Sequence, residues 1–409
     1  MVILKISNMK TIILKQIAFA FVLTLLCSCS EEVEQIPLES NSIAPQQVSN
    51  IKVENLPGKA RLTYTLPKDQ DLLYIKANYT LPTGREMEVK SSYYSNAMLL
   101  EGFTGNDDIN VDVVAVNRSE VESDPVSITV NPLPSPIFDV YNSLDVGEAF
   151  GGIYINAENP ERMDLAILVL NKNEDGDYVA SPNSIYTSTN DIKSRIRGLD
   201  TIAKDFAFTI RDRWLNYTDT LERTITPLFE EAIPKSNYGD LRLPNDAPGH
   251  NSTPKSGMWD NDILNWPRCY LTQGNFLEDT HITSFDIGKL TKLSRIVIWD
   301  YPEYYNGGRE YYYNVCMKEF EIYGSAELEP TGDLDKWTLL GSYEQVKPSG
   351  LPYGQSTSED FEAANSGFSW DIDPNAEPVR YIRIHMIDNW AGTYSMGISE
   401  LQVYGNSNF

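Results

Sequence analysis

The sequence predicts an all-β protein built from tandem β-sandwiches. Apolar residues alternate with polar ones in many short segments, as at Ala60, Leu62 and Tyr64. Turns rich in Gly, Pro, Asn and Asp separate these segments, and no long stretch has the 3.6-residue period of a helix. Frequent short strands with intervening turns are typical of antiparallel sandwiches, so we expect this class throughout the mature chain.

Length and charge limit the classes of function. The chain has 409 residues, which suggests two to four domains at roughly 100–200 residues each. It carries 58 Asp and Glu against 33 Lys and Arg, a formal net charge of −25. A negative surface repels nucleic acid and anionic lipid, so we expect neither as a partner. Four Cys exclude a disulfide-dense scaffold.

Residues 1–28 have the pattern of a signal peptide. They contain Lys5, Lys10 and Lys15 and no acidic residue, and an apolar stretch spans 17–26. This stretch is too short to cross the hydrocarbon core, which needs about 20 residues. Met9 is an alternative start, because Met9-Lys10 also begins a usual basic segment.

The segment ends in Leu26-Cys27-Ser28-Cys29, which resembles the lipobox of bacterial lipoproteins. This resemblance implies lipidation of Cys29, with ordinary signal cleavage as the alternative. The acidic stretch Ser30-Glu31-Glu32-Val33-Glu34 resembles the surface-export signal of Bacteroidetes lipoproteins. No other apolar stretch reaches spanning length, so the resemblance implies a cell-surface location in the outer membrane, held by the lipid anchor only.

The mature chain reads as a tether and three β-rich units. Residues 29–45 are the tether, and residues 46–131 resemble a fibronectin type III domain of about 85 residues. A Pro-rich stretch at 131–136 predicts a stiff linker before a second β-sandwich at 137–235. Residues 236–256, rich in Gly and Pro, read as a second linker before the third unit at 257–406, which contains six of the seven Trp.

The third unit resembles the discoidin-like domains, also called coagulation factor 5/8 type C domains, which include family 32 carbohydrate-binding modules. Seven motifs occur in the family's order over about 150 residues. They are the segments Asp260 to Trp266, Phe285 to Gly288, Leu293 to Trp299, Lys318 to Gly324, Trp337 to Leu340, Val379 to Ile384 and Ile398 to Gly405. The resemblance implies a jelly-roll as the last domain. The whole chain is similar to Bacteroidetes lipoproteins that carry two β-sandwiches ahead of such a domain.

The same resemblance implies a structural calcium site. The family's calcium ligands, carried over to this chain, are Asp260, Asp262 and Glu400. Calcium prefers six to eight hard oxygen ligands, and a tight acidic loop supplies carboxylates and carbonyls. This chain departs from the pattern at Asn261 and Ile263, and Ile263 has no hydroxyl to offer. An acidic turn without a metal is the alternative.

Two aromatic loops of the third unit are the candidate carbohydrate-binding surface. The loop 300–313 holds six Tyr with Arg309, and the loop 388–394 holds Trp390. A sugar needs a flat apolar face for its C–H groups and charged or amide groups for its hydroxyls. The alternative is that several Tyr fold back as a lid on the sandwich. The candidate glycan contacts are Trp390, Tyr304, Tyr305, Arg309, Asp388 and Asn389.

Catalysis is not expected. The mature chain has neither the zinc-protease, nucleophile-elbow nor P-loop motif. A glycosidase needs two carboxylates flanking a cleft, and Asp300, Asp371, Asp373 and Asp388 lie in aromatic-rich segments. Three small sandwiches leave no evident catalytic domain, however. Cys269 and Cys316 are either a disulfide or two buried thiols.

These observations and resemblances together imply a cell-surface carbohydrate-binding lipoprotein of a polysaccharide-utilisation system, which captures glycan through its C-terminal domain. The alternative is a non-enzymatic structural subunit that docks to an outer-membrane transporter complex, with outer-membrane polysaccharide-uptake proteins as partners. A glycosidase is the third alternative. Tyr and Trp are enriched in protein interfaces as well, so the aromatic loops alone do not separate the first two.

Overall fold

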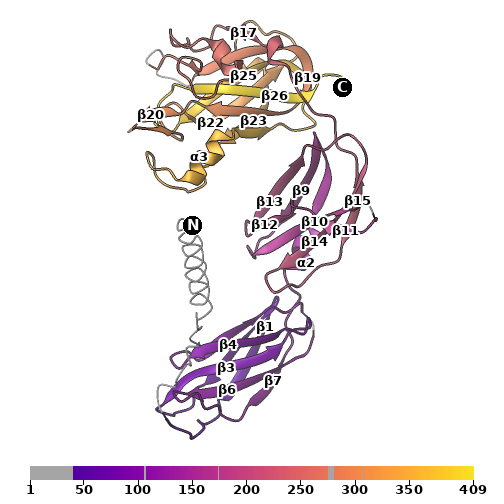
Figure 1. Ribbon diagram of the computed structural model, residues 1–409, viewed down its shortest axis with the longest axis vertical. Helices are drawn as coiled ribbons and strands as arrows, with labels where there is room; N and C mark the ends of the chain where they lie inside the picture. Colours follow the sequence, from indigo (N-terminus) through magenta and orange to yellow (C-terminus); the bar gives the residue numbers. More distant parts are fainter. Residues whose placement is uncertain (1–39, 106, 174, 275–280, 306) are drawn as a thin grey trace, which may run out of the picture. The chain divides into compact units, whose positions relative to one another are not determined.

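The computed structural model describes residues 40–105, 107–173, 175–274, 281–305 and 307–409 (Figure 1). The predicted signal peptide, the lipidation site Cys29 and most of the tether lie outside these residues. Within the described part, no helix is both long and apolar enough to cross a membrane. Nearly all regular structure is strand, and the strands form antiparallel sheets, so the predicted all-β class is confirmed. The described residues divide into two compact units, one that ends at Ser135 and one that runs from Pro136 to Phe409.

The first unit is a sandwich of a three-stranded and a four-stranded sheet, in the orders β1-β2-β5 and β4-β3-β6-β7. Its strands are β1 (Ser49–Leu56), β2 (Lys59–Thr65), β3 (Leu72–Thr80), β4 (Glu86–Ser92), β5 (Ala97–Glu101), β6 (Ile109–Asn117) and β7 (Val126–Val130). The predicted alternation is confirmed along β2, where Ala60, Leu62 and Tyr64 are buried. Tyr79 joins the two sheets, because its hydroxyl donates to the Glu101 carbonyl at 2.8 Å.

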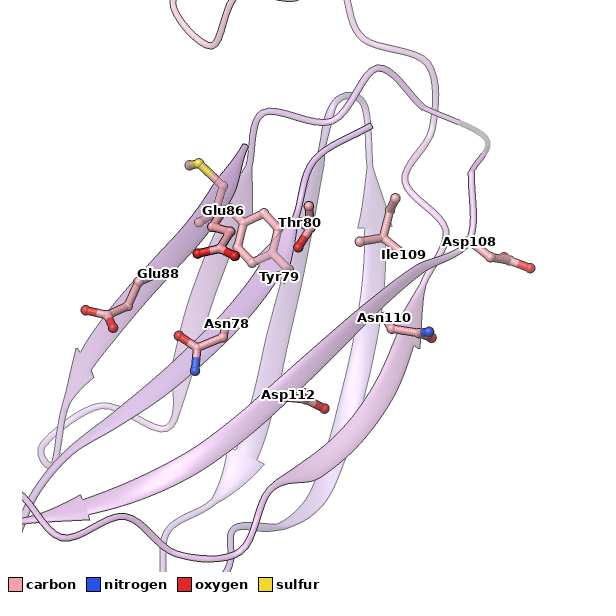
Figure 2. A pocket seen from close by; sticks show the side chains of 10 residues that line it. Asn78, Tyr79, Thr80, Glu86, Glu88, Asp108, Ile109, Asn110 and Asp112 are labelled. Carbon is pink, nitrogen blue, oxygen red and sulfur yellow. The ribbon is translucent and has the colours of Figure 1, made fainter. Parts of the chain in front are cut away.

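A hollow of about 800 Å³ lies on the four-stranded sheet of this unit (Figure 2). Its polar lining is mostly acidic, with Glu86, Glu88, Asp108 and Asp112. Tyr79, its one aromatic ring, is only 4% exposed, since the ring packs on Phe103 in the core. The hollow therefore offers no aromatic face on which a sugar ring could stack.

The second unit begins with a sandwich whose sheets have the orders β13-β9-β8 and β11-β10-β14-β15, with β12 also paired to β10. Its elements are α2 (Ile137–Asn142), β8 (Asp145–Ala149), β9 (Gly152–Glu158), β10 (Leu165–Lys172), β11 (Tyr178–Ala180), β12 (Ile185–Thr187), β13 (Asp191–Arg197), β14 (Lys204–Asp212) and β15 (Leu221–Ile225). Its core holds Ile155 of β9, Ile167 of β10 and Phe208 of β14, and Ile137 and Val140 of α2 cover one end. The short helix α2 was not expected from the sequence.

The C-terminal sandwich follows, with its central sheet in the order β16-β26-β19-β25-β22-β23. Its strands are β16 (Glu231–Ala232), β17 (Gly239–Leu241), β18 (Tyr270–Leu271), β19 (Ile282–Asp300), β20 (Glu303–Tyr305), β21 (Gly308–Glu310), β22 (Met317–Ser325), β23 (Thr338–Glu344), β24 (Phe368–Asp371), β25 (Val379–Asn389) and β26 (Gly397–Asn406). Its helices are η1 (Lys235–Asn237), η2 (Lys255–Trp259), η3 (Leu334–Lys336) and α3 (Ser358–Asn365).

The long strand β19 belongs to both layers of this sandwich. Its residues 282–286 pair with β17 and β25, and its residues 292–300 pair with β26 and β24. Gly288 lies between the two halves with a φ of +81°, and a Cβ there would meet the Asn237 carbonyl oxygen at 2.6 Å. Only glycine fits this bend without strain. Phe285 from one half and Ile296 from the other meet in the same core.

Residues 236–256 are not a linker, contrary to the prediction from the sequence. Tyr238 is 8% exposed and belongs to the C-terminal core, and β17 pairs with β19. Lys255 is 5% exposed, and its ammonium donates to the Leu241 and Ser284 carbonyls. The Gly and Pro residues in this segment shape turns that lie against the sandwich, so the segment is part of it.

Candidate functional site

The β20–β21 hairpin projects from one edge of the C-terminal sandwich, directly after β19 (Figure 1). Tyr304 and Arg309 are cross-strand partners in this hairpin. The Arg309 guanidinium lies 5.7 Å from the centre of the Tyr304 ring, and its Nη1 donates to the Pro302 carbonyl at 3.2 Å. Tyr304 is 67% exposed. The hairpin therefore presents an aromatic ring beside a positioned cation.

Three rings, the first of them in this hairpin, form a stack that we call the tyrosine ladder: Tyr305, Tyr313 and Tyr353. The Tyr305 and Tyr313 ring centroids are 5.2 Å apart with an interplanar angle of 28°. The Tyr313 and Tyr353 centroids are 4.8 Å apart at 18°. Tyr305 and Tyr353 are 47% and 46% exposed. Two exposed aromatic rings, Tyr305 and Tyr353, are thus each stacked with Tyr313.

Buried neighbours hold Tyr313 in this position. Tyr311 and Tyr312 are 4% and 1% exposed, and the Tyr311 ring meets Phe361 of α3 edge-on. The φ of Tyr312 is +52°, in the left-handed region, which reverses the chain direction before Tyr313. The loop thus divides its tyrosines between an anchored pair, Tyr311 and Tyr312, and the partly buried ladder residue Tyr313. Tyr311 and Tyr312 fold back onto the sandwich, as one of the two alternatives from the sequence predicts.

Trp390 is half-buried and held from three sides. Its Nε1 donates to Gln345 Oε1 at 2.6 Å, and its ring meets Tyr312 edge-on at 5.3 Å. The Lys347 ammonium lies 5.2 Å from the Trp390 ring centre. The Trp390 side chain therefore supports the base of the loop that carries Tyr313, and the structure joins the two predicted aromatic loops through this contact.

The two remaining predicted glycan contacts, Asp388 and Asn389, end β25 and differ from each other in exposure. Asn389 is 1% exposed, and its side-chain amide donates to Thr393 Oγ1 at 2.7 Å and to the Ser395 carbonyl at 2.8 Å. These bonds shape the turn after β25. Asp388 is half-exposed and lies 3.9 Å from the Lys318 ammonium.

The sequence analysis did not identify Tyr313 and Tyr353 as members of one surface. Tyr353 lies in Leu351-Pro352-Tyr353-Gly354, a turn pattern that by itself predicts exposure. Its hydroxyl accepts from the Asn314 backbone N–H at 3.3 Å. No local sequence pattern predicts the contact between these distant segments.

The predicted calcium ligands lie on two segments of the C-terminal sandwich. Asp260 and Asp262 lie in the turn after η2, and Glu400 lies on β26. Glu400 Oε2 accepts from the Asn261 backbone N–H at 2.5 Å, which ties the turn to the strand. The Asn261 φ of +67° allows this approach. Glu400 is 2% exposed, and burial raises the pKa of its carboxyl group.

Basic side chains already neutralise these carboxylates. The Lys235 ammonium lies 2.9 Å from Glu400 Oε1, and Arg268 Nε lies 2.9 Å from Asp260 Oδ2. Asp262 accepts N–H groups from Asn265. No group of three or more His, Cys, Asp or Glu side chains suited to a metal occurs among the described residues. Calcium needs six to eight oxygen ligands, so a set already bound to two cations does not fit it.

We therefore expect the thermal stability of the protein to be independent of calcium. A bound ion that recognises only the folded state would raise the melting temperature. The measurement is the melting temperature in EDTA and in excess calcium, and the two values should agree. Lys235→Ala should lower it, because the buried Glu400 carboxylate loses its counter-charge. A rise with calcium in the unaltered protein would instead support the calcium prediction.

Two of the candidate catalytic acids and both cysteines are either buried or bonded to a cation. Asp300 is 2% exposed, and burial raises its pKa to about 7. Asp371 is exposed and bonded to the Arg197 guanidinium. Cys269 and Cys316 are free, buried thiols, and burial raises the pKa of Cys269 to about 12. Thiolates are the reactive form, so these cysteines are packing residues.

Three domain families of unknown function match the chain in succession. The first, described as a domain of unknown function (DUF4959), matches residues 45–132. The second (DUF5126) matches residues 133–236, and the third (DUF5000) matches residues 259–405. No curated protein matches the chain.

Several solved structures are similar to it. A SusE-like protein is 29% identical, with 66% of this chain and 98% of that chain covered and a TM-score of 0.42. A Clostridium perfringens ZmpB structure with two CBM32 domains and an M60 catalytic domain is 16% identical, with 43% and 15% covered and a TM-score of 0.31. Two fibronectin type III domains of chicken tenascin are 13% identical, with 44% and 99% covered and a TM-score of 0.22. All three TM-scores are below 0.5. The proposed function is therefore argued from the residues of this chain.

Proposed function

We propose that this protein is a non-enzymatic, cell-surface carbohydrate-binding lipoprotein that captures glycan through its C-terminal sandwich for polysaccharide utilisation. The observation that carries the proposal is the tyrosine ladder beside Tyr304 and Arg309. The Cys29 lipid anchor and the outer-membrane location belong to the same proposal, and the lipobox-like segment supports them. The order of discoidin-like motifs in the third unit supports the choice of a glycan as ligand.

The ladder has two ring faces suited to a sugar. Tyr313 stacks with both Tyr305 and Tyr353 and is itself partly buried. The outward faces of Tyr305 and Tyr353 remain for the C–H groups of a pyranose ring. Arg309 supplies N–H donors for hydroxyl or ring oxygens at the hairpin. Such an open surface buries only part of a ligand, so we expect modest affinity for a single sugar and better affinity for a chain.

Tyr305→Ala is expected to weaken glycan binding about tenfold or more, because a lost aromatic stack costs on the order of 1.5 kcal/mol. The measurement is isothermal titration of the mature protein against a panel of oligosaccharides. Tyr94→Ala is the matched control, since Tyr94 is 82% exposed and lies in the first unit. Equal affinities for the Tyr305→Ala and Tyr94→Ala variants would contradict the proposed surface.

A second variant in the same titration tests whether Trp390 contacts the sugar. Trp390→Phe keeps an aromatic ring against Tyr312 but loses the hydrogen bond to Gln345. If Trp390 supports the loop and touches no sugar, this variant should bind the glycan more tightly than the Tyr305→Ala variant does. If the panel shows no binding and a stoichiometric protein partner is lost on Tyr305→Ala, the surface is a protein interface.

A further inference from the structure

Lys347 is almost completely buried in the C-terminal sandwich, whereas lysine side chains are usually exposed. It lies just after β23 and is 4% exposed. An ammonium group has three donors and no acceptor. Here all three donors serve one turn, because Nζ donates to the carbonyls of Leu351, Pro352 and Gln355 at 3.1, 3.2 and 3.0 Å. The lysine side chain thus closes the turn that carries Tyr353.

The same ammonium group lies against the rings beneath the tyrosine ladder. It is 5.6 Å from the centre of the Tyr312 ring and 5.2 Å from the centre of the Trp390 ring. A cation is attracted to the face of an aromatic ring. Lys347 therefore ties the Tyr353 turn to the buried aromatic side chains of the two predicted loops.

Asp360 holds the other end of the loop 347–357. It is fully buried in the first turn of α3. Its carboxylate accepts from the Ser349 N–H at 2.8 Å, from the Ser349 hydroxyl at 2.7 Å and from the Thr357 N–H at 2.8 Å. Thr357 in turn caps α3 in a capping box. The loop is thus fixed at both ends by buried charged groups that are bonded to its own residues.

The turn between these two ends buries little apolar surface of its own. Residues 350–356 belong to no helix or strand, and Leu351 and Tyr353 are 37% and 46% exposed. Segments with few buried apolar contacts open most readily. The position of Tyr353 therefore depends on the bonds between its turn and Lys347.

We propose that Lys347 is the positioning residue of the tyrosine ladder. It fixes the Tyr353 turn before a glycan arrives, so that the exposed rings are already in place. A surface that is ordered in advance loses less conformational entropy when it binds. Lys347 itself touches no sugar, because it is buried beneath the turn. This inference rests on the proposed function for its ligand, but the position of Tyr353 can be tested without a glycan.

The first test measures amide hydrogen exchange in the mature protein without glycan. Lys347→Met keeps the length of the side chain but removes its three donors, so the amides of 350–356 should exchange at least about tenfold faster. The amides of β22 and β25 should be unchanged. Lys336→Met is the control and should have no effect, since the Lys336 side chain is 48% exposed on the same sandwich.

Two results of this exchange experiment would overturn the inference. The first is equal exchange of 350–356 in the Lys347→Met variant and in the unaltered protein. The second is faster exchange throughout the sandwich, β22 and β25 included, because Lys347 would then act on general stability and not on the turn.

The second test is a double-mutant cycle on binding, measured by titration with oligomers of glucose, mannose, galactose and xylose. Lys347→Met and Tyr353→Ala should each weaken binding about tenfold. Together they should weaken it no further than either alone, because Lys347 acts through Tyr353. A residue with only a structural role would add its own loss in the Tyr353→Ala background. Losses that multiply therefore overturn the inference.

The two tests separate this inference from the proposed function. If exchange of 350–356 rises in Lys347→Met but no oligomer binds the unaltered protein, the glycan proposal fails and Lys347 still positions the ladder. If Tyr305→Ala weakens binding while Lys347→Met changes neither binding nor exchange, the glycan proposal stands and Lys347 has no such role.

Discussion

Arg383→Met is expected to lower the free energy of unfolding of the C-terminal sandwich by about 3–5 kcal/mol, the usual cost of breaking a buried ion pair. Arg383 is fully buried on β25. Its Nη2 lies 3.1 Å from Asp246 Oδ1, its Nε donates to Ser284 Oγ at 3.0 Å, and its guanidinium lies over the Trp337 ring. Met has a similar length but no donor, so Asp246 loses its main counter-charge inside the protein.

The matched control lies three residues earlier on the same strand. Arg380 makes two hydrogen bonds to Asp286, at 2.8 and 2.7 Å, but its side chain is 41% exposed. Exposed ion pairs contribute about 0–1 kcal/mol, so Arg380→Met should have a small effect. The measurement is denaturant unfolding followed by Trp fluorescence, which reports on this sandwich because six of the seven Trp lie in 257–406.

Two results would contradict this account of Arg383. The first is an equal loss of stability in the Arg383→Met and Arg380→Met variants. The second concerns Asp246→Leu combined with Arg383→Met. Replacing both members of a buried pair with apolar residues is often neutral or stabilising, so the double variant should be more stable than Arg383→Met alone. A further loss in the double variant would show that the ion pair is not the source of the effect.

The sequence predicted the strands well because their information is local. A period of two places every second side chain on the buried face, and Phe320 and Ile322 of β22 are both in the core as this pattern requires. The same reasoning was wrong at residues 236–256. Their composition is typical of a linker, but Lys255 and Asp246 form part of the buried network around Arg383, and no local pattern reveals partners so far along the chain.

The candidate site shows the same division between local and long-range information. The exposure of Tyr304 and Tyr305 followed from a loop rich in Gly, Pro and Tyr. The ladder needed the pairing of Tyr313 with Tyr353, which are 40 positions apart, and sequence alone does not supply it. Of the three carboxylates carried over from the resemblance, Glu400 bonds the Asn261 backbone between the other two, but the two cations beside them, Lys235 and Arg268, were not part of the motif.

Asp300 is expected to make the C-terminal sandwich less stable as the pH rises. Burial raises the pKa of its carboxyl group from 3.8 to about 7, although hydrogen bonds from Gln345 and the Met317 backbone oppose the shift. The group is therefore neutral in the folded protein below pH 7 and ionised in the unfolded chain above pH 4. Its contribution to stability is fully present below about pH 4 and is lost as the pH rises to about 7.

The size of this loss follows from about 1.4 kcal/mol per pH unit for one proton. Between pH 5 and pH 8 the free energy of unfolding should fall by about 2–3 kcal/mol because of this group. Asp300→Asn should abolish that slope, because an amide does not titrate. Asp335→Asn, at an exposed position in η3, is the control and should keep it.

Gln345 makes the Asp300 result informative about the aromatic loop. Its Oε1 accepts from Trp390 Nε1 at 2.6 Å, so its amide nitrogen must face Asp300 Oδ2, also at 2.6 Å. The Asn introduced at position 300 must therefore offer its oxygen there, or Gln345 must turn and release Trp390. A constant offset in stability with no pH slope is expected in either arrangement. An unchanged slope in Asp300→Asn would show that Asp300 does not titrate in this range and is ionised in the folded protein at neutral pH.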